Sequence, residues 1–152
     1  MRVCVLHATR DLRLEERPAL PLGPGQVRVR FGAGGICGSD LHYYFEGRVG
    51  DFAVLEPPIF GHEVAGDVVE VGADVARVRT GDRVAIHPSQ PCWRCRACQA
   101  GRNLCARMTF YGSAAVLPHV QGAFQDPLVC AESHCHVVPE STPHAPPGEP
   151  VA

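Results

Sequence analysis

The sequence contains no lysine, and all 14 of its basic residues are arginines. Schiff-base catalysis, which needs a lysine amine, is therefore excluded. Neither sign of charge dominates, because the 14 arginines stand against 16 acidic residues, whereas a nucleic-acid or anionic-membrane surface needs a basic excess. No apolar run approaches the roughly 18 residues of a membrane span, and the N-terminus lacks the apolar core of a signal peptide. We expect a soluble, cytoplasmic chain with no nucleic-acid and no membrane partner.

Glycine and proline are frequent, with 16 and 14 of the 152 residues, which predicts many turns and few long helices in one domain. A short helix is expected to begin at Ser39 or Asp40, both good N-caps, and to end at Gly47. Alternating apolar and polar residues predict strands over 2–7, 12–16, 26–31, 64–71, 83–87, 122–129 and 136–138. The fold class is therefore mainly β, closer to a barrel than to alternating βαβ units.

Four of the eight cysteines, Cys92, Cys95, Cys98 and Cys105, follow the spacing C-x2-C-x2-C-x6-C. Cytoplasmic thiols stay reduced, so such a cluster indicates metal binding or catalysis before disulfides. Two-residue gaps let successive sulfurs turn toward one ion, which predicts a closed structural zinc site with four thiolate ligands. The surrounding segment, 88–107, holds little apolar material, and we expect a lobe that stands outside the core.

Two alternatives compete for this segment. A redox C-x-x-C pair would normally follow a strand at the start of a helix. A nucleic-acid-binding zinc finger would need a basic total charge, which the chain lacks. The cysteines to which no role is assigned, Cys4, Cys130 and Cys135, are expected to be buried thiols.

A second group of residues carries a family resemblance. Taken singly, Cys37, His62 and Glu63 would be a core thiol, a core histidine and a solvated carboxylate. However, the stretch that begins Gly61-His62-Glu63 has the pattern G-H-E-x2-G-x5-G-x2-V, and GGICGSDLHYYFEGRVG precedes it over 34–50. These motifs resemble the zinc signature of the medium-chain alcohol and polyol dehydrogenases, especially the L-idonate 5-dehydrogenase and sorbitol dehydrogenase branch. The four-cysteine segment is similar to the structural zinc loop of that family.

The resemblance implies a GroES-like barrel catalytic domain over residues 1–140 with a zinc lobe at 88–107. It also implies that 141–152 is a proline-rich tail at the truncated junction to a cofactor domain. Cys37, His62 and Glu63 would be ligands of a catalytic zinc, so that the chain would hold two Zn²⁺ ions. Glu149, in the stretch Glu149-Pro150-Val151-Ala152, matches a further family ligand, or else it is a tail residue in solvent.

The resemblance also implies a reaction: zinc-dependent oxidation of a secondary alcohol in a polyol or sugar acid, such as L-idonate, with hydride transfer to NAD(P). Ser39 and His42 match the proton-relay positions of the family, and Tyr43 matches a position that lines the substrate pocket. All three would therefore be catalytic-site residues.

The Rossmann domain that binds NAD(P) in this family is expected to be absent from these 152 residues. The stretch Gly32-Ala33-Gly34-Gly35-Ile36-Cys37 is a near match to G-x-G-x-x-G, but no long helix is predicted to follow it. We expect one of two protein partners: a separate chain that supplies the cofactor domain in trans, or further copies of this chain in a homo-oligomer. The alternative is a truncated zinc-binding relic without catalytic activity.

Overall fold

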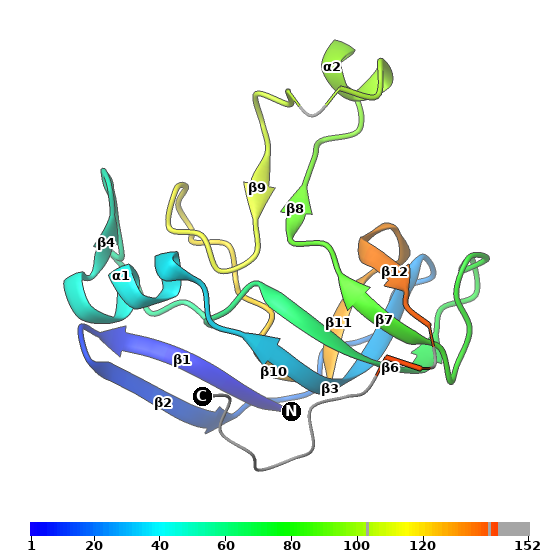
Figure 1. Cartoon of the computed structure of the whole chain (residues 1–152), viewed down its shortest axis with the longest axis horizontal. Coiled ribbons are helices and arrows are strands. Elements are labelled where there is room, and N and C mark those ends of the chain that lie inside the picture. The colour runs from blue at the N-terminus through cyan, green and yellow to red at the C-terminus, as the bar shows by residue number, and fades with distance from the viewer. Residues whose placement is uncertain (103, 140, 143–152) are drawn as a thin grey trace.

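The computed structural model describes residues 1–102, 104–139 and 141–142. Its strands form two antiparallel sheets and two short ribbons (Figure 1). The first sheet has the order β10-β1-β2, and the second has the order β11-β3-β6-β7-β12. The strands of these sheets are β1 (Arg2–Ala8), β2 (Asp11–Glu16), β3 (Gln26–Gly35), β6 (Glu63–Val71), β7 (Arg83–Ile86), β10 (Gln125–Asp126), β11 (Leu128–Ala131) and β12 (Cys135–Val137).

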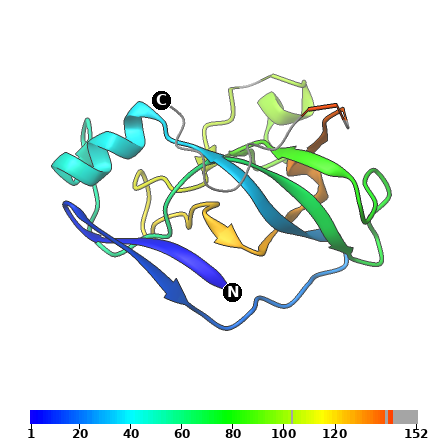
Figure 2. The ribbon, with the colours of Figure 1, turned by 60° about the horizontal axis from the view of Figure 1, so that its bottom comes forward.

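The main core lies inside the curved five-stranded sheet, whose longest strands, β3 and β6, pair with each other (Figures 1 and 2). Its buried residues are mostly valines, and those on β3 and β6 alternate with half-buried or exposed side chains, as a strand with one buried face requires. They are Val27, Val29, Val64, Val68, Val78, Val84, Ile86, Ala123, Leu128, Cys130 and Cys135. The prediction of a mainly β, barrel-like fold is confirmed.

One helix of more than one turn follows β3: α1 (Gly38–Glu46). It ends as predicted at Gly47, whose φ of 69° is the left-handed conformation that glycine adopts without a Cβ clash. The predicted start was wrong, because the N-cap is Cys37 and not Ser39 or Asp40. The carboxylate of Asp40 accepts a hydrogen bond from the backbone N–H of Cys37 at 2.8 Å, so this side chain caps the helix from its third position. Among the described residues, no helix is long and apolar enough to cross a membrane.

A second departure concerns the predicted strand 122–129. It is two strands, β10 and β11, with Pro127 between them. Proline has no N–H to donate to a strand ladder, so one continuous strand cannot pass through this position. The two pieces join different sheets, since β10 pairs with β1 while β11 pairs with β3. Pro127 is thus the point where the chain crosses from one sheet to the other.

The cysteine-rich segment extends away from the sheets, with the short helix α2 at its tip (Figure 1). Its stem is a two-stranded ribbon, and none of the buried cluster residues lies between 88 and 107. The segment is therefore a lobe outside the core, as the sequence predicted. The remaining elements are β4 (Arg48–Val49), β5 (Phe52–Ala53), β8 (Ser89–Gln90), α2 (Arg96–Gln99), β9 (Thr109–Phe110) and the 3-10 helix η1 (Glu132–His134).

Candidate metal centres

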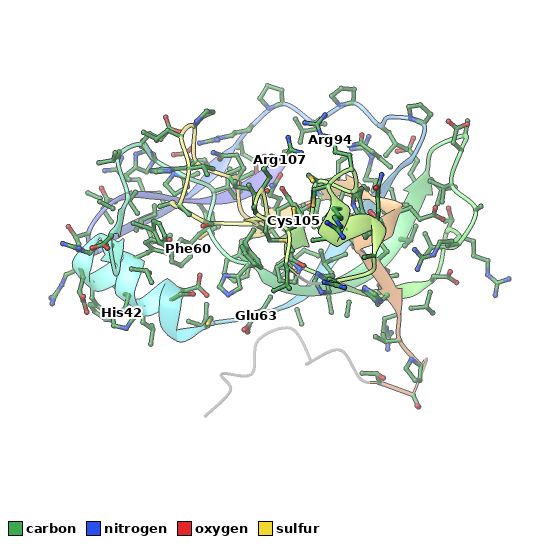
Figure 3. All side chains as sticks on the ribbon, turned by 90° about the horizontal axis from the view of Figure 1, so that it is seen from above. His42, Phe60, Glu63, Arg94, Cys105 and Arg107 are labelled. Carbon is green, nitrogen blue, oxygen red and sulfur yellow. The ribbon has the colours of Figure 1, made fainter. Side chains whose placement is uncertain are left out.

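Cys37, His62 and Glu63 come together because two paired strands end at the same place. Gly35, the last residue of β3, lies opposite Glu63, the first residue of β6. Cys37 follows β3 by two residues, and His62 precedes β6. One ligand atom from each of these side chains lies within 4.8 Å of the others. Figure 3 shows Glu63 close to the point where β3 leads into α1.

Asp40 connects the helix cap to His62. Its side chain is almost fully buried, and Oδ1 lies 3.5 Å from Nδ1 of His62 while Oδ2 accepts the N–H of Cys37. This carboxylate raises the pKa of His62 to about 9 against the opposing effect of burial. In a metal site such a carboxylate holds a ligand histidine in one orientation through the ring nitrogen that faces away from the metal. From the sequence alone Asp40 was expected only as a helix cap, and this contact was not predicted.

The surroundings of Cys37 favour its thiolate. The Ser39 hydroxyl is the main cause that lowers the pKa of Cys37, and the Ser39 backbone N–H and His62 add to it. The thiol also sits at the N-terminus of α1, where the helix dipole stabilises negative charge. A thiolate is the form of cysteine that binds metal, so these surroundings favour the form of Cys37 that a metal site would need.

Gly35 belongs to the motif over 34–50, but the sequence alone assigned it no role at this site. A Cβ at Gly35 would overlap with Oε2 of Glu63, and it would lie 3.1 Å from Cβ of the same side chain. The Glu63 carboxylate therefore lies across the Cα of Gly35. Only glycine leaves room for it there.

The three predicted catalytic residues on α1 have different surroundings. Ser39 is half-buried beside Cys37. His42 is exposed, and its Nδ1 lies 2.9 Å from the carboxylate of Glu46 (Figure 3). Tyr43 is buried among Leu6, Phe60 and Ala114, and its hydroxyl accepts the N–H of Ala114 at 3.1 Å. Glu149 lies outside the described residues.

The second cluster is in the lobe, where the sulfurs of Cys92, Cys95, Cys98 and Cys105 all lie within 4.8 Å of one another. The Sγ–Sγ distance is 3.4 Å from Cys95 to Cys98 and 4.0 Å from Cys92 to Cys98. Four sulfurs about 2.3 Å from a tetrahedral zinc ion lie about 3.8 Å apart, so the spacing fits that ion.

Backbone N–H groups stabilise two of these thiolates. The N–H of Arg94 is the main cause that lowers the pKa of Cys92 to about 6, and the N–H of Cys98 lowers the pKa of Cys95. Trp93, between Cys92 and Cys95, has a φ of 55°, a conformation that is strained for a bulky residue. It bends the chain back within the C-x2-C step. Figure 3 shows Cys105 in the lobe with Arg94 and Arg107 nearby.

Comparison with known proteins identifies this combination of fold and clusters. Residues 23–140 match the family model of the alcohol dehydrogenase GroES-like domain. The chain is 40% identical over 142 residues to sorbitol dehydrogenase of Bacillus subtilis, covering 93% of this chain and 39% of that protein. It is 45% identical over 133 residues to L-idonate 5-dehydrogenase (NAD(P)(+)) of Escherichia coli, covering 87% of this chain and 38% of that protein.

A solved structure agrees with the sequence relatives. The crystal structure of L-idonate 5-dehydrogenase from Escherichia coli superposes with a TM-score of 0.84 at 38% identity, covering 91% of this chain and 40% of that one. The chain thus spans about two fifths of the length of the curated relatives it matches. Because the family model covers most of the chain, the resemblance predicted from the G-H-E and four-cysteine motifs is confirmed. The chain belongs to the zinc-dependent medium-chain alcohol and polyol dehydrogenases, with the GroES-like domain of that family.

Proposed function

We propose that residues 1–140 are the metal-binding catalytic domain of a dehydrogenase that oxidises a secondary alcohol of a polyol or sugar acid, such as L-idonate, with hydride transfer to NAD(P). The observation that carries this proposal is the convergence of Cys37, His62 and Glu63 within 4.8 Å at the edge of the barrel. A mixed set of thiolate, imidazole and carboxylate ligands is typical of catalytic zinc sites, which keep one position open. The all-cysteine cluster of the lobe is typical of a closed, structural site.

The chemistry of the donors fits zinc at both clusters. Cys37, His62 and Glu63 would hold the catalytic ion, with Glu149 as a further candidate ligand, and the lobe cysteines would hold the second ion. A bound zinc ion supplies Lewis-acid chemistry, which favours the deprotonated form of an alcohol near neutral pH. Asp40 orients His62 from behind, and its burial keeps it from rotating into solvent.

The proposed proton route leads from the site to solvent along one face of α1. Ser39 and His42 are three residues apart, a spacing that places side chains on neighbouring turns. The Ser39 hydroxyl would take the substrate proton and pass it to Nε2 of His42, which is exposed and can release it to water. Tyr43 would act from within the core, as a support for α1 at the wall of the substrate pocket, because its hydroxyl is held by Ala114.

We propose that NAD(P) is bound outside residues 1–140, with 141–152 leading toward its domain or with that domain on a partner chain. The one near match to the dinucleotide-binding fingerprint supports this location. Its glycines, within Gly32–Gly35, are part of strand β3 and do not form a phosphate-binding loop. A phosphate-binding loop would instead turn there, between a strand and the N-terminus of a helix.

Zinc analysis and turnover test the proposal together. We expect two zinc ions per chain, and NAD(P)H formation at 340 nm when the protein, together with its cofactor domain, is given NAD⁺ or NADP⁺ and sorbitol, xylitol or L-idonate. Cys37→Ser should lower the zinc content to one per chain and abolish turnover, while Cys4→Ser, at a half-buried thiol remote from both clusters in sequence, should change neither. Two zinc ions without turnover on any polyol or sugar acid would instead favour the zinc-binding relic.

A further inference from the structure

Two cysteines outside both metal clusters form a close pair. Cys130 and Cys135 are 2% and 1% exposed, and their sulfur atoms lie 3.7 Å apart. They are among the core residues of the five-stranded sheet. Two thiols in contact differ from two isolated buried thiols because they can react with each other.

The topology makes this pair unusual. Cys130 lies on β11 and Cys135 lies on β12, and these are the two edge strands of the five-stranded sheet. β11 pairs with β3, whereas β12 pairs with β7, so the two strands belong to opposite ends of the strand order. The curvature of the sheet brings these ends together, and the single turn η1 connects them (Figures 1 and 2). A bond between the sulfurs would join the two edges of the sheet.

We propose that Cys130 and Cys135 are a redox modification site, at which a small hydroperoxide forms a reversible disulfide between β11 and β12. The sulfurs must approach from 3.7 Å to about 2.05 Å, which side-chain rotation and a small strand shift can supply. No metal cluster among the described residues includes either thiol, so zinc binding leaves both available.

The chemistry balances with hydrogen peroxide as the oxidant. The thiolate of one cysteine attacks a peroxide oxygen and breaks the O–O bond, which gives a sulfenic acid and, after protonation, water. The second thiol then attacks this sulfur, the S–O bond breaks, and a second water leaves. In sum, two thiols and one peroxide give one disulfide and two waters, and the pair loses two electrons and two protons.

The electrostatics assign the two roles. The hydrogen bond with Cys130, in which either sulfur can be the donor, lowers the pKa of Cys135, and burial opposes this effect. The same hydrogen bond, together with burial, raises the pKa of Cys130. The lowered pKa favours Cys135 as the sulfur that reacts first, with Cys130 as the thiol that resolves the sulfenic acid, and the disulfide is the same if the two roles are exchanged.

Because both thiols are buried, only a small oxidant can reach them readily. The turn η1 connects the two strands that carry the pair, Ser133 in it is exposed, and none of its residues is buried. Opening of η1 must break the hydrogen bonds that Glu132 accepts from the loop at Ala76–Val78 and those between His134 and His87, and such local opening still costs less than global unfolding. A peroxide passes through this opening more readily than a bulky disulfide reagent does, and reaction is expected to be slower than at an exposed thiol.

The sequence supplies a clean assay. It has no lysine, and its last arginine is Arg107, so trypsin releases a fragment beginning at Met108 in which Cys130 and Cys135 are the only cysteines of the printed sequence. The zinc-loaded protein is treated with hydrogen peroxide, alkylated in denaturant, digested and weighed. We expect an unalkylated fragment about 2 Da lighter than the dithiol, and two alkyl groups on the same fragment after prior reduction with dithiothreitol.

Two controls make the result decisive. Cys130→Val leaves Cys135 without a partner and should never give the fragment that is 2 Da lighter, whereas Cys4→Ala should behave as the unsubstituted protein does. The unsubstituted protein in urea shows that the peroxide is active. The proposal is overturned if the folded protein keeps two alkylatable thiols on the fragment under conditions that oxidise them in urea. It is equally overturned if one cysteine is oxidised to a sulfinic acid while the other stays free, and both results stand even where Cys130→Val does not fold.

Discussion

Gly35 is the residue on which the position of the Glu63 carboxylate depends most directly. The variant Gly35→Ala would place a methyl carbon in steric overlap with Oε2 of Glu63 and 3.3 Å from its Cδ. We expect the carboxylate to move away from Cys37 and His62, and the zinc affinity of this site to fall about tenfold, as it does when the surroundings of a metal ligand are disturbed. Cobalt substitution followed by visible absorption measures this site separately from the four-thiolate lobe.

Gly25→Ala is the matched control, since a Cβ there meets nothing within 4 Å. Its cobalt spectrum and affinity should equal those of the unsubstituted protein. If Gly35→Ala binds cobalt equally well at the mixed-ligand site, the carboxylate of Glu63 does not need its place across Gly35.

The candidate ligands could be predicted from sequence, but their supports could not. Cys37, His62 and Glu63 stand in motifs with fixed spacing, and the structure brings them within 4.8 Å. The contact of Asp40 with His62 joins residues 22 positions apart, and no local pattern encodes it. The need for glycine at position 35 depends on the register between β3 and β6, which becomes visible only when the strands are paired.

At the scale of elements, local alternation predicted the long strands well and their ends less well. The predicted strand 26–31 continues to Gly35, because pairing with β6 extends it beyond the last alternating residue. The short ribbons β4–β5 and β8–β9 were not predicted, since strands of two residues have no period to detect. Tertiary pairing, rather than local propensity, decides such segments.

Glu132 in η1 fastens a neighbouring loop through its carboxylate. One oxygen accepts the backbone N–H groups of Ala76 at 2.8 Å, of Arg77, and of Val78 at 3.3 Å. The N–H of Arg77 is the main cause that lowers the pKa of Glu132 below its ordinary value of 4.5. A lowered carboxyl pKa stabilises the fold above the ordinary pKa, and this stability is lost as the pH falls through the lowered value.

We therefore expect Glu132→Gln to lower the melting temperature by a few degrees at pH 7, and the difference from the unsubstituted protein to shrink as the pH falls below about 4.5. Thermal unfolding followed by circular dichroism between pH 3 and 8 measures this. Glu16→Gln, at a largely exposed carboxylate, should leave the melting temperature unchanged throughout. If the difference in melting temperature is the same at every pH, the variant is destabilised by something other than the loss of the Glu132 charge.

The lobe provides its own protease assay. Arg94, Arg96, Arg102 and Arg107 are exposed, so only the folded conformation of the lobe protects these bonds from trypsin. No residue of segment 88–107 belongs to the three hydrophobic clusters, so we expect the four-cysteine site to be the main source of stability of the lobe. Structural zinc contributes roughly 10–16 kcal/mol to folding in small zinc modules. We expect Cys98→Ser to lose the lobe zinc and to be cut within the lobe at least about tenfold faster.

Cys37→Ser is the matched control, because it removes a thiol from the other cluster and should leave the lobe resistant. Equal rates of cleavage for Cys98→Ser and the unsubstituted protein would show that the lobe is held by contacts other than its metal.

In the molecule as a whole, the residues that form the main core differ from the residues that are candidate zinc ligands. The main core consists largely of side chains from the sheets, mostly valines, and contains none of the candidate zinc ligands. The barrel should therefore keep its structure without metal, while the lobe should not. This differs from small zinc modules, in which metal binding and folding are one event.

Hydrogen exchange on the chelated protein tests this separation. After treatment with EDTA, we expect the amides of segment 88–107 to exchange within seconds, while those of β3, β6 and β7 keep protection close to that of the zinc-loaded protein. The reason is that the strand ladder and the valine core hold the second group, and Glu63, at the very start of β6, is the one candidate metal ligand among these described residues. Added zinc should restore protection in the lobe alone. If chelation exposes the amides of β3 and β6 as well, the barrel depends on its metal, and the site at Cys37, His62 and Glu63 is part of what holds the fold.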